Sequence, residues 1–447
     1  MEIDGSIFKA YDIRGTYPDQ LDDQTAYAVG LGLATLLKPK RAVIGHDMRV
    51  SSEALNSAVI KGLTEGGANV DNIGLVSTDG MYFAVGKYGY DCGVMITASH
   101  NPPQYNGMKI CEKAAVPLSG DGKLGEVREI ILDDKFEKAA TLGAVTRKSI
   151  ISDFVDHILS FVEIPKIKPF KIVVDAGNGM AGMIVPEVFK RLPCQLIPMY
   201  FELDGTFPHH PASPIEPENV ADLKAKIKET GADLGAAFDG DADRVFLIDE
   251  NCKTLGGDMV TALVAKALLK KNPGSTVLYN LICSNAVPEV IESSGGKAIR
   301  TRVGHALIKP LMRKYDAIFG GEHSGHFYFR DNWFADSGLI AFLVCLELIS
   351  EADAPLSKQV RAFDRYFRSG EINSEVKDIP AKLREIERVF HDGEIDKLDG
   401  VTIRYKNWWF NVRPSNTEPL LRLNVEADDE KTLEETTARV LEVIRSK

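Results

Sequence analysis

The chain has 447 residues, of which 44% are hydrophobic and 26% are charged, and its formal net charge is −11. This length is too great for a single hydrophobic core and indicates several domains, while the composition is that of a globular protein. The acidic charge argues against a general nucleic-acid-binding protein, which needs a basic footprint, but a local basic cleft can still attract small anions.

The cysteines and the N-terminal residues bear on the cellular compartment. The six cysteines are scattered without the spacing of metal ligands, which indicates reduced thiols. Residues 1–5 lack the basic and apolar regions of a signal peptide, and no apolar run reaches the roughly 20 residues that span a bilayer. We therefore expect a cytoplasmic protein that binds neither membranes nor nucleic acids.

The first predicted unit is a strand at 41–44 followed by a helix at 51–65, and a further strand at 93–97 leads into the run Thr97-Ala98-Ser99-His100-Asn101-Pro102. A hydroxyl in a tight turn at the end of a buried strand suits a nucleophile or a phosphate carrier. The glycine elbow of esterases is absent, so acyl transfer is disfavoured. Lys109 is a candidate proton donor or positive charge, although a surface lysine is the more ordinary interpretation.

The second unit has a strand at 171–174, a glycine-rich turn at 177–182 and a helix at 181–191. The turn matches the dinucleotide-binding fingerprint, and Glu202 and Asp204 follow about 20 residues later. Any tight strand-to-helix turn uses the same glycines. A nucleotide-dependent oxidoreductase is therefore the weaker alternative.

Between expected strands at 234–238 and 245–248 lie Asp239, Asp241 and Asp243, followed by Arg244. Neighbouring carboxylates repel one another unless a cation neutralises them. A calcium loop needs glycine at its sixth position, where this chain has Arg244, and helices rather than strands at its flanks. A magnesium site with hard oxygen ligands fits better, and a solvated turn is the ordinary alternative.

The third unit has a strand at 277–281 and helices near 286, at 336–350 and at 356–367. It also contains the run 320–326, Gly-Gly-Glu-His-Ser-Gly-His. Glu322 and Ser324 are spaced to bind neighbouring sugar hydroxyls, and the histidines suit proton transfer. A polar turn is the alternative interpretation.

The last 80 or so residues form a smaller α+β unit, with a strand at 401–410, a loop at 413–419 and a helix at 433–444. The loop begins Arg413-Pro414-Ser415-Asn416-Thr417, whose guanidinium, hydroxyls and backbone N–H groups suit a terminal phosphate. We expect linkers near 164–169 and 251–253. The predicted domains are 1–146, 147–251, 252–367 and 368–447.

Together these motifs resemble the α-D-phosphohexomutase superfamily, specifically its bacterial-type phosphomannomutase/phosphoglucomutase branch. The likeness covers the whole chain, from residues 8–15 (Phe-Lys-Ala-Tyr-Asp-Ile-Arg-Gly) through 97–102, 239–244, 301–305 and 320–326 to 413–417. The resemblance implies three similar α/β mixed-sheet domains and a smaller C-terminal α+β domain around a central cleft. The glycine turn at 177–182 then becomes the opening turn of the second domain.

The resemblance also implies roles for individual residues. Ser99 is the expected phosphorylated residue, and it completes a magnesium site formed by Asp239, Asp241 and Asp243. The expected catalytic residues are Ser99, His100, Lys109, Arg244, His305 and Arg14. The expected substrate-binding residues are Tyr11, Lys9, Glu322, Ser324, His326, Arg413, Ser415, Asn416 and Thr417.

The activity implied by the resemblance is the interconversion of hexose 1-phosphate and hexose 6-phosphate, with Mg²⁺ as cofactor and hexose 1,6-bisphosphate as intermediate and activator. The expected partner is a phosphosugar, bound by a monomer or homodimer. Residues 415–417 are similar to the mannose/glucose type, but His323 replaces a typical methionine and a lysine of some members is absent from 279–283. Phosphoglucosamine mutase is therefore the alternative.

Overall fold

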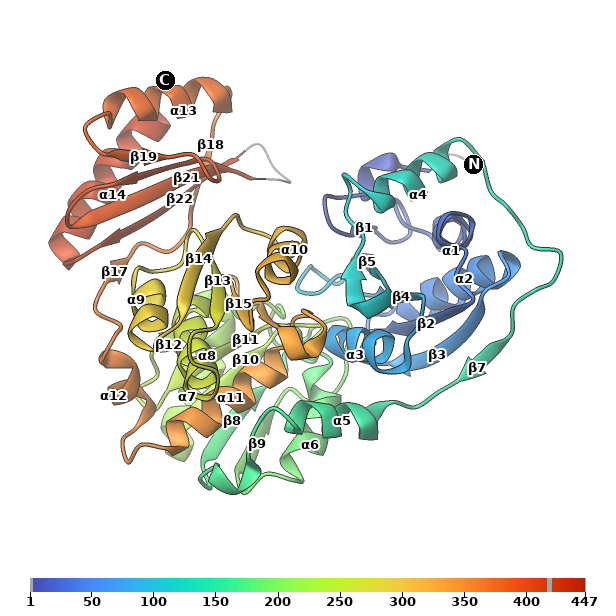
Figure 1. Ribbon diagram of the computed structural model, residues 1–447, viewed down its shortest axis with the longest axis horizontal. Coiled ribbons are helices and arrows are strands. Elements are labelled where there is room, and N and C mark those ends of the chain that lie inside the picture. The colour runs from blue at the N-terminus through green and yellow to red at the C-terminus, as the bar shows by residue number, and fades with distance from the viewer. Residues whose placement is uncertain (1–2, 416–419, 447) are drawn as a thin grey trace.

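The computed structural model describes residues 3–415 and 420–446 (Figure 1). In these residues the strands form four sheets, and we call the parts of the chain that carry them domains I to IV. The expectation of three α/β domains and a smaller C-terminal domain is confirmed. Among the described helices, none combines the length and the apolar character that crossing a membrane requires.

Domain I contains the largest sheet, of mixed direction, in the order β1-β5-β4-β2-β3-β7 with β6 beside β5. Its elements are β1 (Ile13–Thr16), α1 (Asp23–Leu37), β2 (Arg41–His46), α2 (Ser52–Glu65), β3 (Asn69–Leu75), α3 (Thr78–Tyr88), β4 (Cys92–Ile96), β5 (Tyr105–Glu112), β6 (Val116–Pro117), α4 (Lys123–Leu132) and β7 (Val145–Arg147). Every residue of β4 is buried. The turn with Ser99 therefore leaves the carboxyl end of a central strand, where open α/β sheets commonly bind ligands.

Domain II has five strands in the order β12-β11-β10-β8-β9. Its elements are α5 (Ile151–Leu159), β8 (Lys171–Asp175), α6 (Ala181–Phe189), β9 (Gln195–Met199), α7 (Ala221–Thr230), β10 (Leu234–Phe238), β11 (Val245–Asp249) and β12 (Thr254–Leu255). Strands β10 and β11 are antiparallel, and the three aspartates lie in the turn between them. The linker expected at 251–253 is wrong. It is the turn between β11 and β12, where Asp249 Oδ1 accepts from the backbone N–H groups of Asn251 and Lys253.

Domain III has four strands in the order β14-β13-β15-β16. Its elements are α8 (Gly257–Lys271), β13 (Thr276–Asn280), α9 (Ala286–Ser293), β14 (Lys297–Thr301), α10 (His305–Tyr315), β15 (Phe319–Gly321), β16 (Phe327–Phe329), α11 (Gly338–Ser350) and α12 (Leu356–Arg361). Helix α11 is buried along its whole length and contacts α8, β11 and α5, so domains II and III share a core. The helix expected at 356–367 ends at Arg361, because Phe367 and Arg368 pair with the sheet of domain IV.

Domain IV is an antiparallel sheet covered by two helices, in the order β17-β22-β21-β20-β19 with β18 also on β22. Its elements are β17 (Phe367–Arg368), β18 (Ile372–Glu375), α13 (Ile379–Val389), β19 (Glu394–Asp396), β20 (Val401–Arg404), β21 (Trp408–Pro414), β22 (Leu420–Ala427) and α14 (Glu430–Arg445). The single strand expected at 401–410 is wrong. It is a hairpin closed by a 2.9 Å bond from Tyr405 N to Trp408 O, and the aromatic residues after its turn continue the apolar pattern and hide it.

Candidate active site

Ser99 lies in a strained turn beyond β4, with φ of 51°, a left-handed conformation that non-glycine residues rarely adopt. The buried guanidinium of Arg49 holds this turn, because Nη2 donates to the carbonyl oxygens of Ser99 and Asn101 at 2.8 and 2.6 Å. Ser99 Oγ donates to Asp239 Oδ2 at 2.8 Å. The serine of domain I and the aspartate turn of domain II are therefore in direct contact.

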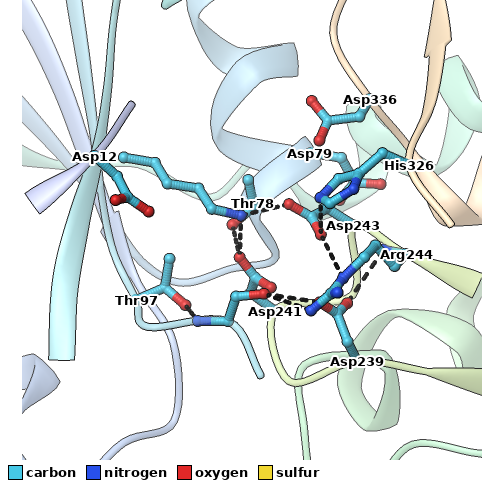
Figure 2. A network of polar contacts seen from close by, with 12 residues as sticks. Asp12, Thr78, Asp79, Thr97, Asp239, Asp241, Asp243, Arg244, His326 and Asp336 are labelled. Atoms are coloured by element: carbon cyan, nitrogen blue, oxygen red, sulfur yellow. Dashed lines mark hydrogen bonds and ion pairs between the residues drawn. The ribbon is translucent and has the colours of Figure 1, made fainter. Parts of the chain in front are cut away.

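The three aspartates of that turn are fully buried, and their carboxylate oxygens lie within 4.8 Å of one another (Figure 2). Oδ1 of Asp241 and Oδ1 of Asp243 have no hydrogen-bond partner among the described residues. Buried carboxylate oxygens without partners are costly unless a cation binds them, and hard oxygen ligands suit Mg²⁺. The donor set therefore fits a divalent cation.

Lys109, on β5, reaches into this cluster. Its Nζ donates to Asp241 Oδ2 at 2.7 Å and to Asp243 Oδ2 at 2.5 Å. Burial opposes the charge of Lys109, but the two carboxylates outweigh burial and raise the pKa of its ammonium. Lys109 is thus a buried cation of the site and not a surface lysine.

Two histidines flank the cluster in uncharged form. The positive charge of Arg244, together with burial, holds the pKa of His100 well below its usual range. Burial lowers the pKa of His326 to about 4. Arg244 itself donates through Nε to Asp239 at 2.8 Å and through Nη2 to Ser99 Oγ at 3.2 Å. Positive charge near Ser99 therefore comes from arginine and lysine, while the imidazoles are neutral at neutral pH.

A cavity of about 780 Å³ adjoins Ser99 and is lined by residues of domains I, II and III. It brings together eight of the expected site residues, which are Lys9, Tyr11, Arg14, Ser99, His100, Lys109, Arg244 and His326. Four of these carry positively charged side chains. Three of them are paired with carboxylates, Arg14 with Asp12, and Lys109 and Arg244 with the aspartate turn, so the cavity holds alternating charges that suit a phosphate together with a divalent cation.

Of the run 320–326 in domain III, His326 lines this cavity, whereas Glu322 and Ser324 are not among its lining residues. Glu322 is buried, which raises the pKa of its carboxyl group, and it accepts from the Tyr328 hydroxyl at 2.7 Å and from Gly304 N at 2.8 Å. Ser324 Oγ lies 3.0 Å from His326 Nδ1. The loop before α10 also approaches Tyr11, because a Cβ atom at Gly304 would lie 3.0 Å from the Tyr11 hydroxyl. The side chain of His305 lies outside the described residues.

The expected phosphate loop is placed in domain IV. Arg413 Nη2 pairs with Glu371 Oε2 at 2.8 Å, and Arg422 Nη2 lies 3.3 Å from Ser415 Oγ. Asn416 and Thr417 lie outside the described residues. Neither Arg413 nor Ser415 lines the cavity at Ser99. Arg413 and Ser415 thus lie in domain IV, outside the cavity that Ser99 lines.

Sequence reasoning missed several residues that build the site. Arg49 holds the Ser99 turn, and Thr78 donates to Asp241 Oδ2 at 2.5 Å. Asp336 lines the cavity and pairs with the buried Lys309 at 2.6 Å. Of these three residues, only Arg49 could have been found from the sequence. It lies in the polar turn after the predicted strand at 41–44, as Ser99 lies in the turn after β4.

The glycine turn at 177–182 packs against the aspartate turn, where Met180 N donates to Gly240 O at 2.9 Å. A Cβ atom at Gly179 would lie 2.6 Å from the Gly240 carbonyl oxygen, and one at Gly182 would lie 2.2 Å from the Phe201 carbonyl oxygen. Both glycines are therefore required by close backbone packing. The alternative of an oxidoreductase loses its sequence support.

Comparisons with known proteins agree along the whole chain. Four family models match in order: phosphoglucomutase/phosphomannomutase alpha/beta/alpha domain I at residues 5–138, domain II at 152–256, domain III at 256–366, and the C-terminal domain at 371–443. A phosphomannomutase of Vibrio cholerae is 41% identical over 434 residues, which is 94% of each chain. One of Methanocaldococcus jannaschii is 40% identical, covering 98% of this chain and 97% of its own.

Among solved structures, the crystal structure of a phosphoglucomutase/phosphomannomutase family protein from Burkholderia thailandensis superimposes with a TM-score of 0.90. It is 31% identical in sequence, and the alignment covers 99% of this chain and 98% of that one. The likeness therefore extends to the order and placement of all four domains.

Proposed function

The chain belongs to the phosphoglucomutase/phosphomannomutase family of α-D-phosphohexomutases, and we propose that it interconverts hexose 1-phosphates and hexose 6-phosphates through a phosphoserine at Ser99. One observation carries this proposal. The Ser99 hydroxyl, in its strained turn, contacts a buried group of three carboxylates that has unpartnered oxygens. A hydroxyl beside a divalent-cation site and the side chains of Arg244 and Lys109 is suited to accept and return a phosphoryl group.

In the proposed reaction, the 6-hydroxyl of a hexose 1-phosphate takes the phosphoryl group from Ser99 and gives up its proton to a base. The resulting hexose 1,6-bisphosphate turns over, its 1-phosphoryl group returns to Ser99, and O1 regains a proton as hexose 6-phosphate leaves. A Mg²⁺ ion held by Asp239, Asp241, Asp243 and a phosphoserine oxygen would supply neutralisation of the charge on the transferring group.

The chain's own residues would position the groups and move the protons. Arg244 already donates to Ser99 Oγ and is placed to bind oxygens of a phosphate there. Lys109 is held as an ammonium and would supply positive charge; the carboxylates that raise its pKa would hold its proton less tightly once a bound cation shares them. We propose Lys109 and His305 for proton transfer, because the lowered pKa of His100 leaves it without an imidazolium proton to donate at neutral pH.

Glu322 and Ser324 would bind the sugar hydroxyls, and Arg413 with residues 415–417 would bind the phosphate that does not react. Both ends of the bisphosphate must occupy the same places in turn. We propose mannose and glucose phosphates as substrates, on the similarity of residues 415–417 to that type, with glucosamine phosphate as the alternative.

The experiment is a side-by-side turnover assay with mannose, glucose and glucosamine 1-phosphates, with Mg²⁺ and a trace of the matching 1,6-bisphosphate. We expect the first two to be converted faster than the third. Preference for glucosamine 1-phosphate would select the alternative, and conversion of none of the three would contradict the proposed function.

A further inference from the structure

Residues 77–79 begin helix α3 and contact all three α/β domains, and we call them the α3 junction. Thr78 makes two bonds to the aspartate turn of domain II. Its backbone N–H donates to the carbonyl oxygen of Asp241 at 3.1 Å, and its hydroxyl donates to Asp241 Oδ2 at 2.5 Å. Both side chains are fully buried. The junction therefore fixes both the backbone and the carboxylate of Asp241 (Figure 2).

Asp79 anchors the same junction to domain III. Its Oδ1 accepts from the Ser77 hydroxyl at 2.5 Å, and its Oδ2 accepts from the Ser337 hydroxyl at 2.6 Å. Ser337 is the N-cap of α11 and accepts from Ile340 N. Since α11 is buried in the core shared by domains II and III, this bond ties Thr78 to a rigid part of the molecule.

The two oxygens of Asp241 are in different situations. Oδ2 accepts from Thr78 and also from Lys109 Nζ at 2.7 Å. Oδ1 is buried and has no hydrogen-bond partner among the described residues. The donors on Oδ2 thus fix the rotation of the carboxylate and leave Oδ1 without a hydrogen bond, beside a turn that holds two more buried aspartates.

We propose that Thr78 is a positioning residue of the metal site, which presents Oδ1 of Asp241 to the divalent cation. The inference rests on the cation site of the proposed function and adds a residue to it. Groups that hydrogen-bond to metal ligands orient them, and their loss typically weakens metal binding about 10- to 100-fold. The hydroxyl does not serve the helix, since it bonds to Asp241 and not to the backbone of α3.

The test compares Thr78→Val, which keeps the shape of the side chain but removes the hydroxyl, with Thr78→Ser, which keeps the hydroxyl. Mg²⁺ affinity is measured by titration calorimetry on the full-length protein, and folding by the melting temperature without metal. We expect Mg²⁺ binding about 10-fold weaker in the valine variant and close to wild type in the serine variant. If the valine variant does not fold, Thr78→Ala carries the same expectation.

The matched control is Thr35→Val. Thr35 is a buried threonine whose hydroxyl donates to Leu31 O within its own helix at 2.8 Å, so this change should leave Mg²⁺ affinity unaltered. Wild-type affinity in Thr78→Val, or an equal loss in Thr78→Ser, would overturn the positioning role. A wild-type protein that binds no Mg²⁺ would instead refute the cation site of the proposed function, and the inference with it.

Discussion

The junction of domains I, II and III differs in kind from the contact between domains III and IV. One apolar cluster runs from α3 through the sheet of domain II to α8 and α11, and buried charges cross it. Domain IV has a core made only of its own residues. Its contacts with domain III are polar. Arg404 lies 3.1 Å from Asn285 and Arg302 lies 4.0 Å from Asp399, and two buried carboxylates join the domains, since Glu426 accepts from Asn285 N at 3.0 Å and Asp258 pairs with Arg368 at 3.3 Å.

The difference suggests a division of labour between a fixed chemical centre and a more loosely attached binding surface. These polar contacts do not form the continuous apolar core that joins domains I, II and III. If the proposed bisphosphate turns over in the site, one part of that site must yield. We propose that this part is domain IV, which carries Arg413 and has a hydrophobic core of its own.

The largest expected effect is at the centre. Ser99→Ala removes the hydroxyl that would carry the phosphoryl group, so we expect turnover to fall by about three orders of magnitude or more. Calorimetric affinity for hexose 1-phosphate should change little, because the cations lining the cavity remain. Ser160→Ala, an exposed change in domain II, is the control. Substantial activity in Ser99→Ala would contradict the proposal that Ser99 carries the phosphoryl group.

Asp241→Asn should have the next largest effect. The change removes a negative charge from the carboxylate group, and we expect Mg²⁺ affinity to weaken by about 100-fold and the rate at a fixed, low Mg²⁺ concentration to fall with it. Asp222→Asn, an exposed aspartate on α7 bonded to the Tyr200 hydroxyl, is the control. An unchanged metal titration would place the cation elsewhere.

Domain IV should affect binding more than chemistry. Arg413→Lys loses the planar fork that binds a phosphate through two bonds, and we expect KM to rise about 10-fold with kcat near that of the wild type. Arg388→Lys, on the helix α13 of the same domain, should change neither. If kcat of Arg413→Lys fell as much as that of Ser99→Ala, domain IV would take part in the chemical step, which contradicts its proposed role in binding alone.

The smallest effect is on the pH dependence of stability. Burial raises the pKa of Asp79 from 3.8 to about 7, so between these values the folded protein keeps a proton that the unfolded chain releases. This group therefore stabilises the fold less as the pH rises through that window. Asp79→Asn should flatten the pH profile of the melting temperature by a few degrees between about pH 4 and pH 7.

The control for this profile is Asp204→Asn. Asp204 is partly exposed, and hydrogen bonds from Thr206 keep its pKa below the ordinary value, so it is already ionised throughout the window. It should leave the profile as in the wild type. An equally steep profile in Asp79→Asn would show that Asp79 is not the buried group that titrates there.

The sequence predicted those site residues that form a recognisable local motif. Ser99 stands out because it follows a buried strand in a polar turn, and the three aspartates stand out because they are two residues apart in one turn. Thr78, Asp79 and Asp336 were not predictable, because they are common residue types that meet the site only through tertiary contacts. The expected strand at 401–410 was wrong for a related reason, since the aromatic residues after the turn continue the apolar pattern of the strand before it.

The most direct test of the account is the covalent state of Ser99. Intact-mass analysis followed by peptide mapping, on protein incubated with Mg²⁺ and a hexose 1,6-bisphosphate, should show an added mass of about 80 Da, one phosphoryl group, on the peptide that contains Ser99. An active enzyme that carries no such group, or carries it on another side chain, would contradict the account.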